Sequence, residues 1–367
     1  MTATAETANQ VFRRLRNGGD TREMLRYVAV PGRGTARWLL PVGRPEIGGV
    51  LESWAPFRLA SRAAWTAVRA ASHIGRVADI PGVSVLEVEG VRGTDWSALG
   101  WRWREPPVAV IYLGTPGPRR KAVVHLVERE TEQCRAVVKV PLTDWAKAAV
   151  LHEADVLEAL AAEGYEPAPR MLHADRARGI TTQTFVEGHS ASRRLGPDVW
   201  RLLRSLMLPG ENTSLAAEAE AWRRELGSGA NLGVPSRVAA RVIDELTDSA
   251  PLPACWEHGD FTPWNIKRLS NGGCVLLDWE NARRRGLPLL DAFHFLHMQD
   301  FLFEGRPKLH AVEIMAAAVE MGMAPAQCLK LEAAYLVGAY VKSRQQENAE
   351  RARIACAALE LYRRKAA

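Results

Sequence analysis

Two acidic residues and an asparagine in the second half of the chain have the types and the spacing of a phosphoryl-transfer site. Asp260 and Asn265 lie in a segment that Gly259 and Pro263 keep out of regular structure. Asp278 follows an apolar run that predicts a strand. Transfer of a γ-phosphoryl group needs a carboxylate that orients and deprotonates the acceptor hydroxyl, and oxygen ligands that hold Mg²⁺ against the nucleotide phosphates. The spacing therefore predicts Asp260 as the catalytic base, and Asn265 and Asp278 as metal ligands.

Three motifs around these residues resemble those of the aminoglycoside phosphotransferase and choline kinase family. The first two are similar to its catalytic loop, His258-Gly259-Asp260-Phe261-x-Pro263-x-Asn265, and to its metal-binding turn, Asp278-Trp279-Glu280. The third is similar to its downstream motif, Gly286-x-Pro288-x-x-Asp291. A buried polar loop between strands is the alternative, but it does not explain three motifs in this order. The resemblance implies an α+β, bilobal protein-kinase-like fold, with a small antiparallel-sheet lobe and a large, mainly helical lobe, and ATP as the phosphoryl donor.

An upstream lysine and glutamate complete the site that this resemblance implies. A β-branched run at 134–140 carries one lysine, Lys139, and a helical pattern follows at 149–160. In kinases a strand lysine contacts the α- and β-phosphates and is held by a glutamate of a helix. The resemblance points to Lys139 and Glu153, with Glu158 as the alternative on the same helix. A strand lysine by itself is usually a solvated edge residue, but the downstream motifs favour the phosphate-binding role.

The segment expected to cover the nucleotide lacks a glycine-rich motif. Runs at 108–113 and 121–127 predict a hairpin whose loop contains no G-x-G-x-x-G. Pro116 and Pro118 have no backbone N–H to offer a phosphate. The loop is expected to contact the nucleotide through Thr115, Arg119 or Arg120, or only to cover it. An ordinary exposed turn is the alternative.

The remaining elements divide the chain into three predicted regions. The segment 179–188 resembles the last small-lobe strand and the hinge of the family, which implies that backbone groups from Thr184 to Val186 meet the adenine. Residues 106–187 are then the kinase-like small lobe, and residues 188–367 are the helical large lobe. Apolar periodicity predicts helices in this lobe near 235–246, 309–322, 326–345 and 347–365.

The first 105 residues are not explained by the family and are predicted to form a small α/β cap domain. A helix is expected near 11–15, strands around 25–30 and 37–42, and a helix through 60–69. We expect this cap to pack on the small lobe, because its apolar side chains are too many to leave in water: Trp38, Leu39, Leu40, Trp54, Phe57 and Trp65. The basic stretch 58–76 has a membrane-surface helix as its alternative interpretation.

Composition excludes several other classes of protein. The 367 residues are 47% hydrophobic and 25% charged, which is ordinary globular material. The net charge is +6, but the basic residues alternate with acidic ones, which argues against nucleic-acid binding. Five cysteines without C-x-x-C spacing predict neither a disulfide framework nor a zinc site and fit the cytoplasm. No signal segment is expected at the N-terminus, and no run approaches the roughly 20 apolar residues of a membrane span.

The acceptor is the least determined feature. It is expected beside a polar cluster that follows Asp291, formed by His294, His297, Gln299, Asp300 and Glu304. An aminoglycoside needs several carboxylates, for which the candidates are Asp300, Glu304, Glu332 and Glu347. Choline needs an aromatic cage, for which the candidates are Phe293, Phe295, Phe301, Phe303 and Tyr335.

A neutral sugar or related hydroxylated metabolite needs neither of these features and is favoured as the acceptor. An aminoglycoside or amino-alcohol kinase is the alternative within the same class. A non-catalytic binding protein of kinase fold is the alternative from another class, and intact Asp260, Asn265, Asp278 and Lys139 argue against it. The expected partners are therefore a nucleotide and a small hydroxylated substrate.

Overall fold

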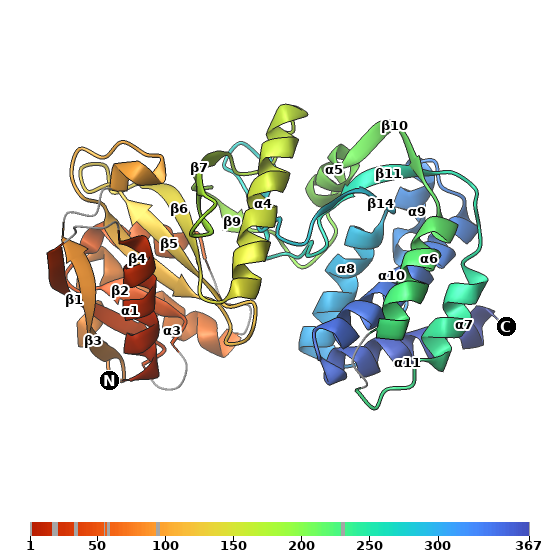
Figure 1. The fold of residues 1–367 in the computed structure, drawn as a ribbon, viewed down its shortest axis with the longest axis horizontal. Helices are drawn as coiled ribbons and strands as arrows, with labels where there is room; N and C mark the ends of the chain where they lie inside the picture. The colour runs from red at the N-terminus through yellow and green to blue at the C-terminus, as the bar shows by residue number, and fades with distance from the viewer. Residues whose placement is uncertain are drawn as a thin grey trace. The chain divides into compact units, whose positions relative to one another are not determined.

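A computed structural model of the chain describes residues 2–16, 21–32, 36–54, 56, 59–92, 96–228 and 232–366 (Figure 1). The chain divides into two compact units. Unit 1 contains Met1–Ser190, Lys267–Asn271 and Val275–Glu280, and unit 2 contains Ala191–Ile266, Gly272–Cys274 and Asn281–Ala367. Unit 1 is built on an antiparallel sheet and unit 2 is mainly helical, so the predicted α+β architecture is confirmed. Within the described ranges, no helix is long and apolar enough to cross a membrane.

The sheet of unit 1 has eight strands in the order β3-β1-β2-β4-β5-β6-β8-β7. Every ladder that joins neighbouring strands is antiparallel. The strands are β1 (Thr21–Val30), β2 (Trp38–Pro41), β3 (Ser84–Arg92), β4 (Val108–Leu113), β5 (Lys121–Val127), β6 (Cys134–Pro141), β7 (Met171–Asp175) and β8 (Ile180–Thr184).

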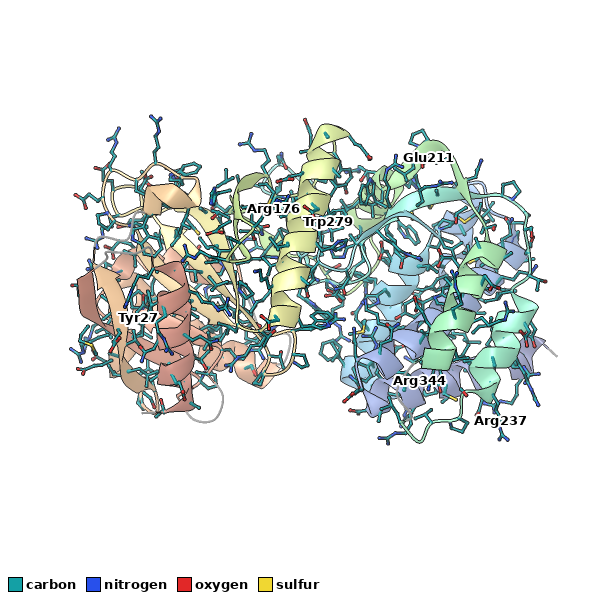
Figure 2. All side chains as sticks on the ribbon, in the orientation of Figure 1. Tyr27, Arg176, Glu211, Arg237, Trp279 and Arg344 are labelled. Atoms are coloured by element: carbon teal, nitrogen blue, oxygen red, sulfur yellow. The ribbon has the colours of Figure 1, made fainter. Side chains whose placement is uncertain are left out.

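Alternating side chains give this sheet two apolar faces. On β1, Tyr27 joins a core that includes Phe12 of α1 (Ala3–Leu15), whereas the next residue, Val28, joins a second core with Trp65 of α3 (Leu59–His73). The same period-2 pattern continues along β2 and β4, because successive strand residues point to opposite faces. The Tyr27 hydroxyl donates to the Ala109 carbonyl at 3.1 Å and joins β1 to β4 on the α1 side (Figure 2).

The strands of the N-terminal 105 residues continue directly into the sheet of the small lobe. β2 pairs with β4 through Trp38↔Tyr112 and Leu39↔Ile111, so the cap predicted from the sequence shares one sheet with the lobe that it was expected to cover. Its helices and turns are α1, η1 (Pro45–Ile47), α2 (Gly48–Glu52), α3, η2 (Val77–Asp79) and η3 (Trp96–Leu99). The predicted strands and helices are observed there, whereas β3 was not anticipated, and Phe57 lies outside the described residues. The boundary at residue 105 stays a prediction.

Unit 1 also contains the helix that carries Glu153. α4 (Asp144–Ala162) begins after Thr143, whose hydroxyl accepts from the Ala146 N–H at 3.0 Å. This helix contacts β6, β7 and β8. A small sheet in the order β13-β12-β9 joins one strand that precedes the catalytic segment in the sequence to two strands that follow it. Its strands are β9 (His189–Ser190), β12 (Ile266–Arg268) and β13 (Cys274–Leu276).

Unit 2 is organised around α10 (Pro325–Gln345), which contacts the helices α6, α7, α8, α9 and α11. The Tyr340 side chain of α10 is fully buried, as expected for a helix with neighbours on several sides. The other helices are α5 (Pro197–Ser205), α6 (Leu215–Ser228), α7 (Arg237–Glu245), α8 (Leu290–Gln299), the π-helix η4 (Asp300–Glu304), α9 (Ala311–Glu320) and α11 (Ala349–Ala366). A three-stranded sheet contains β10 (Met207–Thr213), β11 (Leu252–Glu257) and β14 (Arg283–Gly286).

Candidate active site

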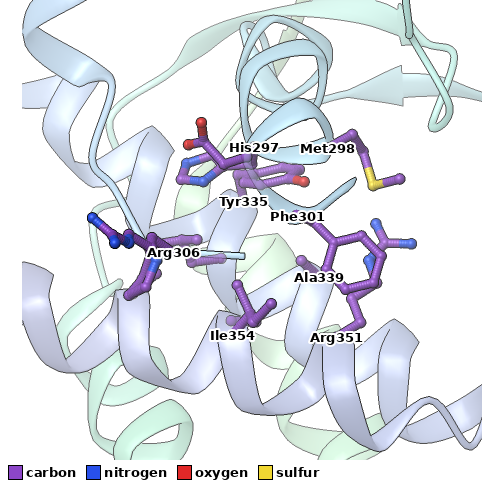
Figure 3. A pocket seen from close by; sticks show the side chains of 13 residues that line it. His297, Met298, Phe301, Arg306, Tyr335, Ala339, Arg351 and Ile354 are labelled. Atoms are coloured by element: carbon purple, nitrogen blue, oxygen red, sulfur yellow. The ribbon is translucent and has the colours of Figure 1, made fainter. Parts of the chain in front are cut away.

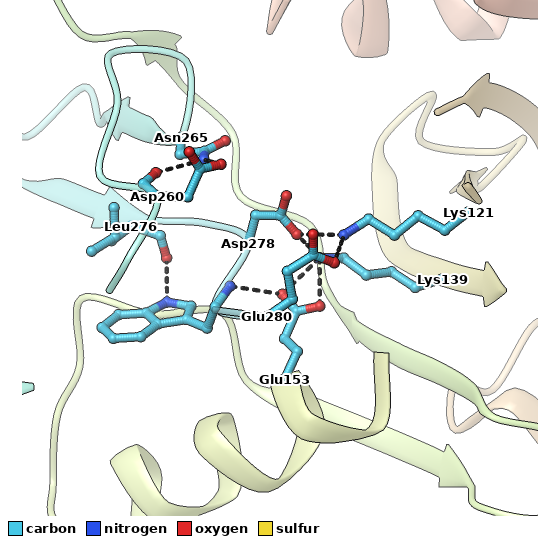
Figure 4. Close-up of polar contacts among 9 residues, drawn as sticks. Lys121, Lys139, Glu153, Asp260, Asn265, Leu276, Asp278 and Glu280 are labelled. Atoms are coloured by element: carbon cyan, nitrogen blue, oxygen red, sulfur yellow. Dashed lines mark hydrogen bonds and ion pairs between the residues drawn. The ribbon is translucent and has the colours of Figure 1, made fainter. Parts of the chain in front are cut away.

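Lys139, Glu153 and Asp278 come from three separate segments and meet in unit 1 (Figure 4). The Lys139 ammonium group lies 2.6 Å from each Glu153 carboxylate oxygen and 2.9 Å from Asp278 Oδ1. The Lys139 side chain is 4% exposed and that of Glu153 is 2% exposed, so each charge depends on the other for compensation. Glu158 forms its ion pair elsewhere, with Arg176. The structure thus places Glu153, and not Glu158, beside Lys139.

A second lysine, Lys121, joins this cluster and was not anticipated from the sequence. Its Nζ lies 2.7 Å from Asp278 Oδ1 and also donates to Glu280 Oε2. Lys121 begins β5, and Val123, two residues further on, is in register with Lys139. Lys121 and Lys139 therefore point to the same face of adjacent strands. The available signal was a lysine directly after the hairpin loop, at the start of an alternating strand.

The two lysines control the charge of Asp278. Burial by itself raises the pKa of the Asp278 carboxyl, but Lys121 and Lys139 outweigh it and hold the pKa well below its usual range. Burial likewise tends to lower the pKa of Lys121, but Asp278 and Glu280 outweigh it and raise the pKa. Asp278 is therefore an ionised carboxylate at neutral pH.

The backbone around Asp278 is strained and firmly held. Asp278 has a φ of 68°, a left-handed conformation that costs roughly 1–3 kcal/mol in a non-glycine residue and occurs most often at functional sites. The next residue, Trp279, is fully buried, and its indole N–H donates to the Leu276 carbonyl at 2.8 Å (Figure 4). The Trp279 backbone N–H donates to Glu153 Oε1 at 3.2 Å. Glu153 therefore holds both Lys139 and the turn that presents Asp278.

Asp260 and Asn265 form a second cluster, which lies in unit 2. The Asn265 amide donates to Asp260 Oδ2 at 3.0 Å and to the Asp260 carbonyl at 2.9 Å, so the side chain spans the loop (Figure 4). His294 of α8 approaches the other carboxylate oxygen of Asp260, Oδ1, at 3.1 Å. The sequence had assigned His294 only to the polar cluster near the acceptor.

The catalytic loop is anchored by Asp291, the last residue of the predicted downstream motif. The Asp291 carboxylate accepts from the backbone N–H of His258 at 2.7 Å and of Gly259 at 3.0 Å. Burial, followed by the charge of Glu257, raises the pKa of Asp291 to about 7. Gly259 has a φ of 72°, and a Cβ at this position would lie 2.7 Å from the Asn281 carbonyl oxygen. Only glycine fits there without a shift of the backbone.

Oxygen atoms suited to Mg²⁺ are present in both clusters. Asn265 uses its NH₂ group to bind Asp260, which leaves its carbonyl oxygen as a ligand. Both lysine bonds to Asp278 go to Oδ1, and within the described part of the chain no partner is recorded for Oδ2. Carboxylate and amide oxygens are the ligands that Mg²⁺ prefers. The donor set therefore fits the predicted metal.

The residues predicted to meet the rest of the nucleotide have protein partners of their own. The exposed Thr115 hydroxyl accepts from Arg37 at 3.0 Å, and the Arg119 guanidinium lies 3.8 Å from the ring centroid of Trp145. These contacts fix the hairpin loop within unit 1.

The predicted hinge follows β8. The Thr184 backbone N–H donates to the Arg170 carbonyl at 2.9 Å, and its hydroxyl accepts from the Arg170 N–H at 3.0 Å. Within the described residues no hydrogen bond is recorded for Val186. Thr184 also lines a cavity of about 430 Å³ in unit 1, together with Phe185 and Glu187. The Thr184 N–H is thus already used, which favours Val186 for contact with the adenine.

An antiparallel-sheet unit with a buried Lys139–Glu153 pair and a helical unit with an Asp260–Asn265 loop define a protein-kinase-like phosphotransferase. The family model described as "phosphotransferase enzyme family" matches residues 121–326, more than half of the chain. The chain belongs to this family. No curated protein matches this chain by sequence.

The chain is also similar to solved structures at low sequence identity. The apo form of a thermostable mutant of aminoglycoside phosphotransferase APH(4)-Ia is 14% identical, with 70% of this chain and 94% of that chain covered and a TM-score of 0.49. Choline kinase LicA from Streptococcus pneumoniae is 13% identical, with 68% and 92% covered and a TM-score of 0.47. Macrolide 2'-phosphotransferase MphH from Brachybacterium faecium is 17% identical, with 68% and 91% covered and a TM-score of 0.45.

Proposed function

We propose that this phosphotransferase uses ATP and Mg²⁺ to phosphorylate a hydroxyl group of a sugar or a related hydroxylated metabolite. The observation that carries the proposal is the buried Lys139 ammonium group, which contacts both Glu153 and Asp278. This arrangement places a phosphate-binding cation next to a metal-binding carboxylate. A structural ion pair between Lys139 and Glu153 would not need Asp278. The strained backbone and the ionised carboxyl of Asp278 suit a functional role.

The nucleotide is bound through residues of unit 1. Lys139 contacts the α- and β-phosphates, as the strand lysine does in kinases. Lys121 contributes a second positive charge on the same face of the sheet. The backbone of Val186 meets the adenine edge, and the Thr115 loop covers the phosphates.

Asn265 and Asp278 are the ligands for Mg²⁺ through the oxygen atoms described above. When bound, this ion neutralises the negative charge of the nucleotide phosphates. Asp278 supplies a full negative charge, because its lysine partners keep its carboxyl ionised.

Asp260 orients the acceptor hydroxyl and takes its proton. The hydroxyl oxygen forms a bond to the γ-phosphorus, the bond between this phosphorus and the β,γ-bridging oxygen breaks, and ADP leaves with that oxygen. The proton of the hydroxyl moves to the Asp260 carboxylate. The side chain of Asp260 is 31% exposed, so an acceptor can reach it.

The choice of a neutral acceptor rests on the carboxylates and aromatic rings of unit 2. Asp300 contacts His310 at 2.6 Å, and Glu332, which is 1% exposed, contacts His297 at 3.0 Å. Glu332 is committed to this internal contact and is a poor partner for the ammonium groups of an aminoglycoside, and Asp300 already has an ammonium partner, Lys308, at 3.7 Å. Phe293 and Phe295 are fully buried in the core and do not supply a cage for choline.

A panel of sugars, aminoglycosides and amino alcohols tests the proposal through acceptor-dependent formation of ADP with MgATP. We expect turnover with at least one neutral hydroxylated compound and not with choline. Mass spectrometry of the product should show one added phosphate. Turnover with aminoglycosides alone would contradict the proposed acceptor class but would still support the proposed kinase activity. An absence of acceptor-dependent ADP across the panel, together with tight binding of MgATP, would favour a non-catalytic binding protein.

A further inference from the structure

The catalytic carboxylate is held at both of its oxygen atoms, by one residue of the catalytic loop and by one residue of α8. Asn265 donates to Asp260 Oδ2, whereas His294 approaches Oδ1 from α8 at 3.1 Å. The His294 side chain is 6% exposed, so packing fixes its ring. A carboxylate has about four lone-pair directions, which leaves acceptor capacity for the proton of a substrate hydroxyl.

The other ring nitrogen of His294 faces Tyr335 of α10. The Tyr335 hydroxyl lies 3.4 Å from His294 Nδ1, and the two rings are arranged edge to face, with centroids 5.9 Å apart. Arg351 of α11 acts on the pKa of Tyr335 in the direction opposite to burial. Both residues line a small cavity of about 30 Å³ in unit 2, where Figure 3 shows them. Hydrogen bonds thus connect Tyr335 of α10 to His294 of α8, and His294 to Asp260.

The acceptor at Asp260 sets the direction of this chain. A carboxylate only accepts, so His294 donates from Nε2 to Asp260 Oδ1, and its Nδ1 is left to accept the hydroxyl hydrogen of Tyr335. Burial raises the pKa of Tyr335 to about 12, so the phenol retains this hydrogen at neutral pH. A neutral histidine that accepts at Nδ1 carries its one hydrogen on Nε2, and that N–H points at Asp260.

Burial keeps the His294 ring neutral. It lowers the pKa of His294 from 6.5 to about 4, although the hydrogen bond to Asp260 acts in the opposite direction. At neutral pH the ring therefore has one N–H, and the partners of its two nitrogens, Asp260 and Tyr335, decide which nitrogen carries it.

We propose that Tyr335 and His294 form a directional hydrogen-bond chain that positions Asp260 and presents its carboxylate as a proton acceptor. The inference rests on the proposed function, in which Asp260 is the base. His294 is a positioning residue, because it acts through Asp260 and takes no proton from the substrate. Asn265 and His294 together fix the rotation of the carboxylate.

Two substitutions of His294 separate a positioning role from a packing role. His294→Leu fills the space without a donor, and misorientation of the base should lower kcat by about tenfold to a hundredfold. His294→Gln restores an N–H donor and should recover most of kcat. The KM for ATP should stay unchanged in both variants, because the proposed nucleotide contacts lie in unit 1. Equal kcat values for the leucine and glutamine variants would overturn the proposal.

Tyr335→Phe tests the chain without changing the residue that touches Asp260. It removes only the hydroxyl, and we expect kcat to fall several-fold. Tyr340→Phe is the matched control on the same helix, because its hydroxyl donates to the Val234 carbonyl at 2.9 Å. The control should lose comparable thermal stability and keep kcat. If both variants keep the wild-type kcat, or if both lose it equally, the chain does not position the base.

A double-substitution cycle tests whether His294 acts through Asp260. In the Asp260→Ala background no carboxylate remains to be positioned, so adding His294→Leu should not lower the residual rate further. A further tenfold loss would assign His294 a role independent of Asp260 and overturn the proposal. Wild-type protein that forms no acceptor-dependent ADP would contradict the proposed function itself. An active wild type with an unimpaired His294→Leu variant would contradict the chain alone.

Discussion

The two carboxylates expected to do the chemistry are held in opposite ways. Asp278, in unit 1, is bound by two ammonium groups, those of Lys121 and Lys139. Asp260, in unit 2, is bound by the neutral amide of Asn265 and by the neutral ring of His294.

This difference matches what each carboxylate is proposed to do. Cationic partners stabilise the charged form of Asp278 and hold its pKa well below the usual range, which suits a metal ligand and not a base. A general base must be oriented and must also keep its affinity for a proton. The Asn265 amide and the His294 ring fix the orientation of Asp260 through neutral donors. These donors differ from the ammonium groups that hold Asp278, although the two side chains are of the same type.

The largest expected effect comes from removing the base. Asp260→Asn keeps the size of the side chain and one of its two acceptor oxygens but cannot take a proton, so kcat should fall by roughly 10²- to 10⁴-fold. MgATP binding, measured by calorimetry, should stay at the wild-type level, because the change leaves the lysine cluster of unit 1 intact. A near-wild-type kcat in this variant would remove Asp260 from the role of base and would end the contrast with Asp278.

The local part of the site could be predicted from the sequence. Asp260, Asn265 and Asp278 were identified because motif spacing encodes a loop and a turn within a short stretch of chain. Periodicity predicted the strand and the helix, and the family resemblance pointed to Lys139 and Glu153 on them. These expectations needed only neighbours in sequence.

The partners that distinguish the two carboxylates could not be predicted in this way. Lys121 reaches Asp278 through the pairing of β5 with β6, and Tyr335 reaches His294 through packing between α8 and α10. Each is a single residue in an ordinary pattern, and its role depends on contacts far apart in the sequence. The continuation of the small-lobe sheet into β2 was missed for the same reason, since strand pairing is set by long-range contacts.

The next largest expected effect is on the free energy of unfolding, and it should differ between substitutions of Lys139 and of Lys121. Lys139→Met leaves Glu153, which is 1% exposed, as a buried charge without its ammonium partner, and should cost about 3–5 kcal/mol in the free energy of unfolding. Lys121→Met should cost less, because the side chain of Asp278 is 29% exposed and keeps Lys139, and Glu280, whose pKa burial raises, can take up a proton when Lys121 is lost. Urea unfolding of both variants measures the difference. Equal losses would show that the two lysines do not differ in this way.

Acidification tests whether His294, a partner of Asp260, is neutral in the folded protein. His294 has a folded-state pKa of about 4 against an ordinary value of 6.5. Because the folded-state pKa of His294 is lowered, this residue adds to the free energy of unfolding. The contribution is fully present above pH 6.5 and is lost as the pH falls through about 4. The difference between the two pKa values corresponds to at most about 3 kcal/mol in the free energy of unfolding. His294→Gln does not titrate, so its unfolding free energy should decrease less between pH 7 and pH 4. Parallel curves for the variant and the wild type would contradict the neutral state of His294.

The smallest expected effect concerns the metal. Asp278→Asn keeps an acceptor for Lys121 and Lys139 but removes the charge that attracts Mg²⁺, so the tightening of nucleotide binding by Mg²⁺ should weaken by about tenfold, or 1.4 kcal/mol. Glu280→Gln is the matched variant, because Glu280 also binds Lys121 but has no proposed metal role. It should retain the tightening, as measured by calorimetry with and without Mg²⁺. If Asp278→Asn also retains it, the lysines hold Asp278 only as a structural ion pair. The two carboxylates would then differ in their partners without dividing the chemistry between them.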